Sequence, residues 1–432
     1  MKKILDPKRE TWAEILKRPT QSYTDIEPLV AEIFDEIDNR GDAAVKTYVE
    51  KFDKAILSAF EVETSEIQKA KASLSTDLKN AIQLAKLNIE AFHASQKTEP
   101  IKIESTPGVI CWQEKRPIEK VGLYIPGGTA PLFSTILMLA VPATIAGCEE
   151  LVMCTPSDAD GNVHPAVLYT ADLCGVTKIF KVGGIQAIAA MTFGTETIPK
   201  VYKIFGPGNQ YVTVAKQMAM KFGVGIDLPA GPSELLVYAD ESATASFMAA
   251  DLLSQAEHGT DSQVVLVCTS LEKLEEIEKE VAIQLADLPR KDIATMAIEN
   301  SKLIFCSSEE KAIDLINNYA PEHLIISTSD SSSILGEIKN AGSVFVGDYS
   351  PESAGDYASG TNHTLPTNGF ARNYSGVNLD AFQKAVSFQE ISKEGLLKIG
   401  RAIELMADAE GLYAHQNAVS LRIAKINKEL NK

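Results

Sequence analysis

The chain of 432 residues has little histidine, no long apolar run and fewer basic than acidic side chains. Its 41 Lys and Arg stand against 58 Asp and Glu, and the net charge of −17 argues against binding to a nucleic-acid backbone. The most apolar stretch, 132–147, contains Ser, Thr and Pro and is shorter than the roughly 20 residues of a membrane span. The N-terminus has no uninterrupted apolar core and no cleavage site, so we expect a cytoplasmic protein with no membrane partner.

The six cysteines form no CxxC pair. Cys154, Cys268 and Cys306 lie in apolar, strand-like runs, where a free thiol behaves as a small hydrophobe. A disulfide framework is not expected in a large cytoplasmic chain. We therefore expect buried thiols rather than a catalytic cysteine, and nitrogen and oxygen ligands for any metal. A nucleotide cofactor is not excluded by the acidity, because backbone amides can hold phosphates.

The spacing of apolar residues divides the chain into a helical part and an α/β part. Residues 10–98 have helical spacing, with apolar residues every three or four positions in 26–37. From about 117 onward, short apolar runs alternate with stretches of helix length, which indicates parallel sheets covered on both faces. The expected strands are 120–125, 151–154, 178–182, 201–205 and 225–228 in one unit, and 235–238, 263–268, 302–306, 323–326 and 343–346 in a second.

Glycine-bearing turns follow several strands of the first unit, but none contains the G-x-G-x-x-G fingerprint of dinucleotide sites. Tyr124, Gln186 and Asn209 lie at or just beyond three of these strand ends. Ligands bind at the carboxyl ends of parallel strands, so these three are candidate ligand contacts. The glycines are equally explained by positive φ angles or close packing.

Four of the six histidines stand in short polar motifs beside acids and amides. Gln255 and His258 are three residues apart at the expected end of a helix, where both could bind one metal ion. The alternative is a helix C-cap, because Gly259 follows directly. Spacing alone leaves both interpretations open.

Glu322 and His323 follow a proline at the start of an expected strand. Two adjacent bases there could both reach a pocket and serve an enzyme that moves several protons. The alternative is a polar pair at the edge of the strand, where it begins. The segment 347–376, which contains Asp356 and His363, is rich in Gly, Ser, Asn and Tyr, and we expect a long functional loop. The segment from 379 to 432 is predicted to be helical.

Seven motifs, taken in order, resemble the histidinol dehydrogenase family. They cover the chain from about 116 to 420, and the N-terminal helices fit by length and character only. The motifs are VGLYIPGG at 121–128, FGPGN at 205–209, IDLPAGPSE at 226–234, SQAEHG at 254–259, APEHL at 320–324, GDYASGTNHTLPT at 355–367 and EGLYAH at 410–415.

The resemblance implies a site for one Zn²⁺ per subunit and for NAD⁺, shared between the subunits of an interlocked homodimer. Glu322 and His323 match the family's acid–base pair, and Tyr124, Gln186 and Asn209 match its NAD⁺ contacts. The positions that match its zinc ligands are Gln255, His258, Asp356 and His415, the last from the partner subunit. The positions that match its substrate contacts are Ser233, His323, Glu410 and the four zinc ligands. His363 recurs in the motif without a role that we can assign.

The resemblance also implies two incomplete Rossmann-like, doubly wound domains with helical N-terminal and C-terminal segments. We expect helices at 1–115 packed on the second α/β unit, an NAD⁺-binding domain at 116–234, a domain with the metal and acid–base residues at 235–378, and a C-terminal tail at 379–432 that reaches the partner. The implied reaction is the four-electron oxidation of L-histidinol to L-histidine through L-histidinal, with two NAD⁺. Alternatives are a relative that oxidises another small polar alcohol, a zinc hydrolase, and a binding protein without activity.

Overall fold

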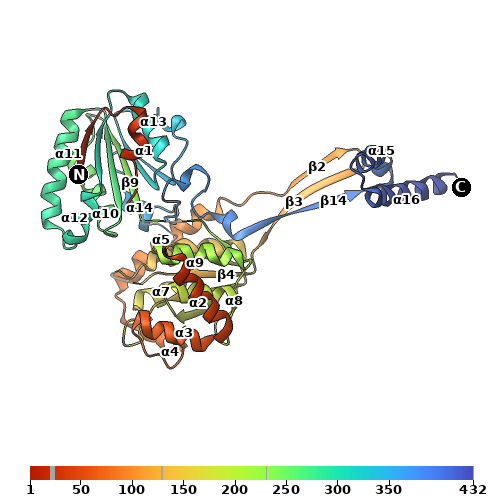
Figure 1. The fold of residues 1–432 in the computed structure, drawn as a ribbon, viewed down its shortest axis with the longest axis horizontal. Coiled ribbons are helices and arrows are strands. Elements are labelled where there is room, and N and C mark those ends of the chain that lie inside the picture. Colours follow the sequence, from red (N-terminus) through yellow and green to blue (C-terminus); the bar gives the residue numbers. More distant parts are fainter. Residues whose placement is uncertain (20–24, 128–129, 230, 432) are drawn as a thin grey trace. The chain divides into compact units, whose positions relative to one another are not determined.

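The computed structural model describes residues 1–19, 25–127, 130–229 and 231–431 and divides the chain into two compact units (Figure 1). The first unit comprises residues 1–96 and 118–382, and the second comprises 97–117 and the chain from 383 onward. Gly128 and Ala230, which belong to two of the motifs quoted above, lie outside the described residues. No helix within the described ranges is long and apolar enough to cross a bilayer.

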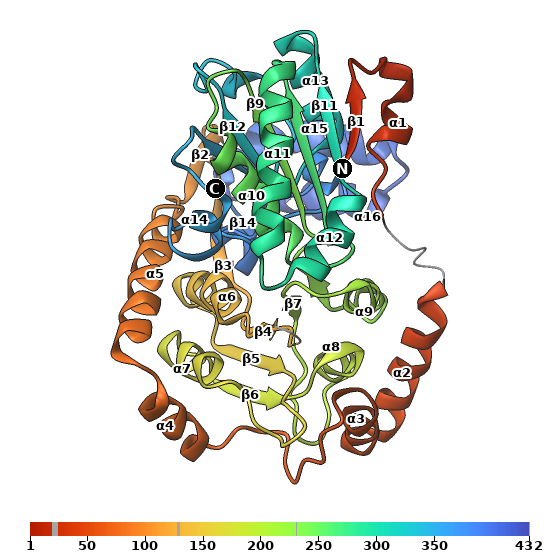
Figure 2. The ribbon, with the colours of Figure 1, turned by 90° about the vertical axis from the view of Figure 1, so that its left-hand side faces the viewer.

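The first unit contains two parallel sheets, one of which has the strand order β6-β5-β4-β7-β8. Figure 2 shows α6 and α7 on one face of this sheet and α8 and α9 on the other. Numbered along the chain the order is 3-2-1-4-5, as in a Rossmann fold without its sixth strand. The elements are β4 (Lys120–Tyr124), α6 (Phe133–Ala146), β5 (Glu150–Thr155), α7 (Pro165–Leu173), β6 (Lys178–Lys181), α8 (Gly184–Phe193), β7 (Lys203–Phe205), α9 (Gln210–Lys221) and β8 (Gly225–Ile226).

The second sheet of this unit, β1-β11-β10-β9-β12-β13, repeats the same order and adds β1 at one edge. One face packs against α10, α11 and α12, and the other against α1 and α13. The predicted α/β class with two parallel sheets is confirmed. The elements are β1 (Lys2–Leu5), α1 (Trp12–Ile15), β9 (Glu234–Ala239), α10 (Ala245–Ala256), β10 (Gln263–Cys268), α11 (Leu271–Asp287), α12 (Lys291–Glu299), β11 (Lys302–Phe305), α13 (Glu309–Tyr319), β12 (His323–Ser327), β13 (Ser343–Val346) and α14 (Glu352–Tyr357).

The N-terminal segment divides between the two sheets, so its expected packing on the second α/β unit alone is wrong. β1 and α1 do pack there, but the helices from 27 to 94 cover the first sheet. Phe34 contacts Phe193 of α8 at a ring distance of 5.7 Å. An apolar stripe predicts a buried helix face but not the sheet that buries it. These elements are α2 (Glu27–Arg40), α3 (Asp42–Tyr48), the π-helical turn η3 (Val49–Asp53), α4 (Thr64–Ser73) and α5 (Thr76–Ala94).

The second unit corrects the expectation that residues 1–115 and 379–432 are helical throughout. It contains the antiparallel sheet β14-β3-β2 and two helices. Trp112 stacks on Phe388 with ring centres 5.1 Å apart. β3 and β14 are so far apart in the sequence that no local pattern predicts their pairing. The elements are β2 (Ile101–Thr106), β3 (Val109–Pro117), β14 (Gln383–Ile391), α15 (Lys393–Ala409) and α16 (Tyr413–Leu430).

Candidate active site

Glu322 and His323 lie at the amino end of an interior strand. β12 pairs with β9 on one side and with β13 on the other. The two residues are only 6% and 4% exposed. Burying two polar groups is unfavourable unless they have partners or a chemical task.

One residue, Glu234, holds both members of this pair through its backbone. Its N–H donates to Glu322 Oε2 at 2.8 Å, and its carbonyl oxygen lies 3.2 Å from His323 Nδ1. A carbonyl only accepts, so Nδ1 carries the proton and Nε2 is left as a bare base. Burial lowers the pKa of His323, which favours its neutral form, and burial raises the pKa of Glu322 well above its usual range.

His323 Nε2 faces a cluster of side chains that could hold a metal ion. It is buried without a hydrogen-bond partner among the described residues and lies 3.8 Å from Asp356 Oδ1. Ligand atoms of His258, Glu352 and Asp356 all lie within 4.8 Å of one another. Imidazole nitrogen and carboxylate oxygen are donors that zinc accepts.

Gln255 lies in the last turn of α10, just before His258. Both its Oε1 and its Nε2 are buried without a partner within the described ranges, an unfavourable arrangement for an amide unless a ligand satisfies it. The alternative of a glycine helix cap is wrong, because Gly259 is not among the positive-φ glycines.

The expected loop 347–376 contains a short helix, α14, which presents two acids to this cluster. Asp356 was predicted from the sequence and Glu352 was not. Glu352 is 1% exposed, its Oε2 accepts from Ser254 Oγ at 2.9 Å, and its Oε1 is 3.8 Å from His323 Nδ1. The spacing of four between the two acids could have indicated a shared helix face.

His363 ties α14 to the first sheet's helices. Its Nδ1 lies 2.9 Å from the Asp356 carbonyl oxygen, and its Nε2 lies 3.1 Å from Thr135 Oγ1 in the first turn of α6. Both ring nitrogens therefore have partners, unlike those of His323. The ring links α14, which carries Asp356, to α6.

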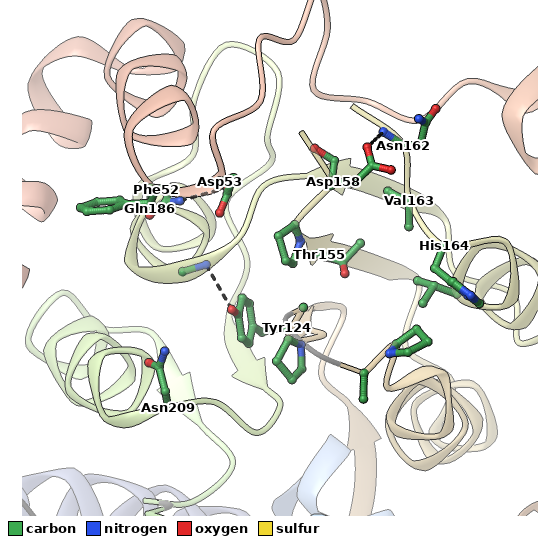
Figure 3. A pocket seen from close by; sticks show the side chains of 18 of the residues that line it. Phe52, Asp53, Tyr124, Thr155, Asp158, Asn162, Val163, His164, Gln186 and Asn209 are labelled. Carbon is green, nitrogen blue, oxygen red and sulfur yellow. Dashed lines mark hydrogen bonds between the residues drawn. The ribbon is translucent and has the colours of Figure 1, made fainter. Parts of the chain in front are cut away.

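The three predicted cofactor contacts line one cavity of about 930 Å³ at the carboxyl ends of the first sheet (Figure 3). Tyr124 Oη accepts from the Gly184 N–H at 3.1 Å, and Asn209 caps α9 by accepting from the Val212 N–H at 3.1 Å. Burial raises the pKa of Tyr124 to about 12, so its hydroxyl stays protonated.

Asp53 also lines this cavity, and the sequence carried no signal for it because it ends a helical segment. Its Oδ2 lies 3.3 Å from the Gly183 nitrogen and 3.4 Å from Gln186 Nε2, both of which donate.

The remaining predicted site residues divide between the two units. Ser233 is half-buried and directly precedes β9 in the first unit. Glu410 directly follows α15 and His415 lies in the first turn of α16, and both are exposed in the second unit.

Comparison with known proteins identifies the family. The family model for histidinol dehydrogenase matches residues 16–423. The chain is 58% identical to histidinol dehydrogenase from Bacteroides thetaiotaomicron, over 98% of this chain and 99% of that one, and 49% identical to the Escherichia coli K12 enzyme, over 97% and 96%. The crystal structure of histidinol dehydrogenase from Elizabethkingia anophelis is 55% identical and superimposes with a TM-score of 0.97 over 99% of both chains. The chain belongs to the histidinol dehydrogenase family.

Proposed function

We propose that this protein oxidises L-histidinol to L-histidine through L-histidinal, with zinc and two NAD⁺. The observation that carries the proposal is the bare Nε2 of His323, a neutral base aimed at a cluster of zinc-ligating donors. Such a nitrogen can accept the proton of an alcohol as its hydride departs.

Gln255, His258 and Asp356 would hold the zinc, together with His415 from a partner subunit. The unsatisfied amide of Gln255 and the converging donors of His258 and Asp356 fit such an ion. When bound, zinc supplies a positive centre that orients the substrate's nitrogen atoms. Glu352 lies close enough to His258 and Asp356 to support their geometry.

His323 and Glu322 then divide the proton transfers. His323 takes the hydroxyl proton in the first oxidation, which yields the aldehyde. Glu322 takes a proton from water as that water attacks the aldehyde, and its raised pKa brings the carboxylate nearer to the required basicity. Once its first proton has passed to solvent, His323 takes the hydroxyl proton of the hydrate in the second oxidation, as the second hydride leaves for NAD⁺.

NAD⁺, the hydride acceptor of both oxidations, would bind in the cavity lined by Tyr124, Gln186 and Asn209. This cavity lies at the carboxyl ends of β4 and β7, where the strand order reverses, and ligands of doubly wound folds bind at that position. Ser233 and Glu410 would contact the substrate, with Glu410 pairing to its ammonium group.

The second unit supports a homodimer. Its helices leave large apolar side chains in solvent, whereas most soluble surfaces avoid such patches. Those more than half exposed on the two helices are Leu405, Met406, Tyr413, Leu421 and Leu430. A second copy of the chain that covers them would also bring its own Glu410 and His415.

The test is the stoichiometry of NADH. Zinc-loaded protein with excess NAD⁺ and limiting L-histidinol is expected to release two NADH per histidinol. Glu322→Gln is expected to release about one, because it removes the base for the second step. No NADH from the parent protein contradicts the substrate, and one NADH with free aldehyde contradicts the four-electron course.

A further inference from the structure

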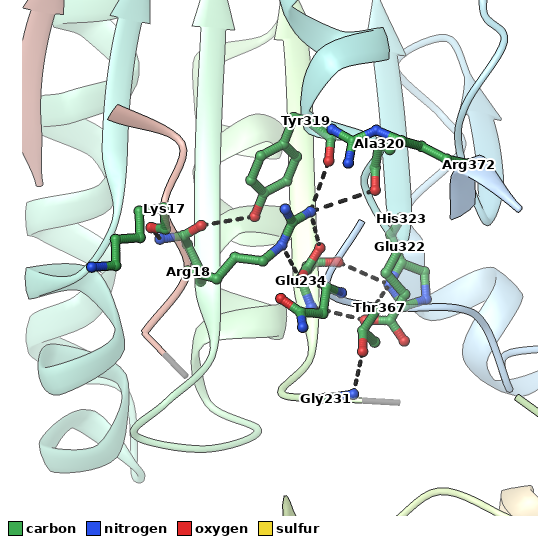
Figure 4. A network of polar contacts seen from close by, with 12 residues as sticks. Lys17, Arg18, Gly231, Glu234, Tyr319, Ala320, Glu322, His323, Thr367 and Arg372 are labelled. Atoms are coloured by element: carbon green, nitrogen blue, oxygen red, sulfur yellow. Dashed lines mark hydrogen bonds and ion pairs between the residues drawn. The ribbon is translucent and has the colours of Figure 1, made fainter. Parts of the chain in front are cut away.

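A buried ion pair lies beside Glu322 and His323 (Figure 4). Arg18 Nε is 2.5 Å from Glu234 Oε1, and Arg18 Nη2 is 2.8 Å from Glu234 Oε2. The two side chains are 12% and 3% exposed. Two parallel N–H···O bonds fix the carboxylate in orientation as well as in position.

Arg18 is itself held on several sides. Its Nη2 donates to the Tyr319 carbonyl at 2.8 Å, and its guanidinium lies 4.0 Å from the centre of the Tyr319 ring. The Tyr319 hydroxyl donates to Gln263 Oε1 at 2.9 Å, and Gln263 Nε2 donates to the Lys17 carbonyl at 3.1 Å. This loop of contacts leads back to Lys17, the neighbour of Arg18, so the guanidinium has little freedom.

Glu234 connects this ion pair to the proposed acid–base pair. Its side chain is clamped by Arg18, while its backbone N–H and carbonyl contact Glu322 and His323. Any displacement of the Glu234 backbone that follows the loss of its side-chain anchor would move both backbone contacts together. In the part of the chain that the structure describes, no hydrogen bond or ion pair joins Arg18 directly to either base, so its influence passes through Glu234.

We propose that Arg18 and Glu234 are positioning residues that set the tautomer of His323 and the orientation of Glu322. The proposal rests on the proposed roles of those two bases. Arg18 lies in the N-terminal segment, for which no function was predicted from the sequence. Catalysis tolerates little misplacement, and an error of 1 Å costs on the order of a hundredfold in rate.

The test compares Arg18→Ala and Arg18→Lys with Arg40→Ala, which removes an exposed helical ion pair to Glu36. For each zinc-loaded variant, kcat and the KM for NAD⁺ are measured with and without millimolar guanidinium, beside the thermal melt and the reference variants Glu322→Gln and His323→Ala. Arg18→Ala is expected to lose about a hundredfold in kcat with an unchanged KM for NAD⁺, because the cofactor residues lie on the other sheet.

Added guanidinium is expected to raise the kcat of Arg18→Ala by at least about tenfold and to leave the kcat of the other variants unchanged. Arg18→Lys keeps the charge without the two parallel bonds, so it should lose kcat even if Arg18→Ala does not fold. An Arg18→Lys enzyme with parental kcat overturns the proposal. The proposal is also overturned if the loss of kcat in Arg18→Ala matches its unfolded fraction and guanidinium does not restore it. Arg18 would then contribute to stability alone. If His323→Ala stays active, the proposed function of the base fails first, and the positioning role falls with it.

Discussion

Two histidines beside the same acid differ in what their nitrogens contact. His323 and His363 each have a ring nitrogen within 4 Å of Asp356 Oδ1. His363 uses both nitrogens to join α14 to α6, whereas His323 donates from one and leaves the other bare. A histidine can act as a base only if a lone pair stays free, so the contacts of each nitrogen decide its role.

Gln255 offers a test of the proposed metal site at the level of one residue. Gln255→Ala is expected to weaken zinc binding by about tenfold or more, because a donor atom is lost. The affinity can be measured by competition with a chromophoric chelator. Gln284→Ala, which removes an amide that bonds to the Ser246 carbonyl, serves as the control. Equal zinc affinity of the two variants would rule out Gln255 as a ligand.

The buried thiols of Cys174, Cys268 and Cys306 are expected to react slowly in the folded protein. All six are free, and burial raises the pKa of Cys174 to about 12 and those of Cys268 and Cys306 to about 11. A thiolate forms only as the pH approaches these raised pKa values, so the reactive fraction at pH 8 is small. Alkylation at pH 8 should be at least about a hundredfold slower than in urea, measured by mass spectrometry of the peptides.

Rapid labelling of these three cysteines in the native protein would contradict their burial. The expectation of complete burial does not hold for Cys111 and Cys148, which are partly exposed.

At the scale of elements, the turns after strands bring the proposed cofactor residues together. The turn between β7 and α9 begins at Gly206, whose φ of 132° and contact with the Tyr124 carbonyl leave no room for a Cβ. Buried Lys216 donates to the Gly206 carbonyl at 2.8 Å, and Asp227 accepts from the Gly206 N–H at 2.8 Å. The turn that leads to Asn209 is thus held from both sides.

Gly206→Ala should therefore disturb the cofactor site selectively. The added methyl group pushes against the Tyr124 backbone, and we expect the KM for NAD⁺ to rise about tenfold while zinc affinity is unchanged. Steady-state kinetics and the chelator competition measure the two quantities. Gly336→Ala is the control, because its Cβ would meet open space. An unchanged KM would mean that this turn does not shape the cofactor cavity.

At the scale of the molecule, two sheets of the same strand order have their candidate functional residues at opposite ends of their strands. The first sheet has its cavity at the carboxyl ends. In the second sheet, Glu234 and His323 begin their strands, so the proposed acid–base residues lie at the amino ends. At its carboxyl ends, Asp240 accepts from Ser242 and Ser329, and Asp348 accepts from Thr244 and Ser327. These internal hydrogen bonds satisfy the acids that could otherwise meet a ligand.

Subunit mixing tests whether active sites are shared. His415→Ala and His323→Ala are each expected to be inactive alone. After random exchange, half of the dimers are mixed, and each mixed dimer has one intact site, so activity should recover to about a quarter of the parental level. The recovered rate and the dimer composition are measured together. Mixed dimers without activity would contradict a site completed by the partner.

The sequence by itself determined the fold class and most of the candidate residues. Alternation of short apolar runs with helices is enough to specify parallel sheets, because local periodicity reflects which side of an element is buried. The ordered motifs indicated the family and with it the residues around Glu322, His323 and Asp356.

Only the tertiary structure decided which groups act on one another. Arg18 and Glu234 are 216 residues apart, and β3 and β14 are more distant still. The bare nitrogen of His323, the unsatisfied amide of Gln255 and the second acid of α14 depend on neighbours from other elements. The physical reason is that hydrogen bonding and burial are properties of assembled neighbours, whereas periodicity is a property of the chain.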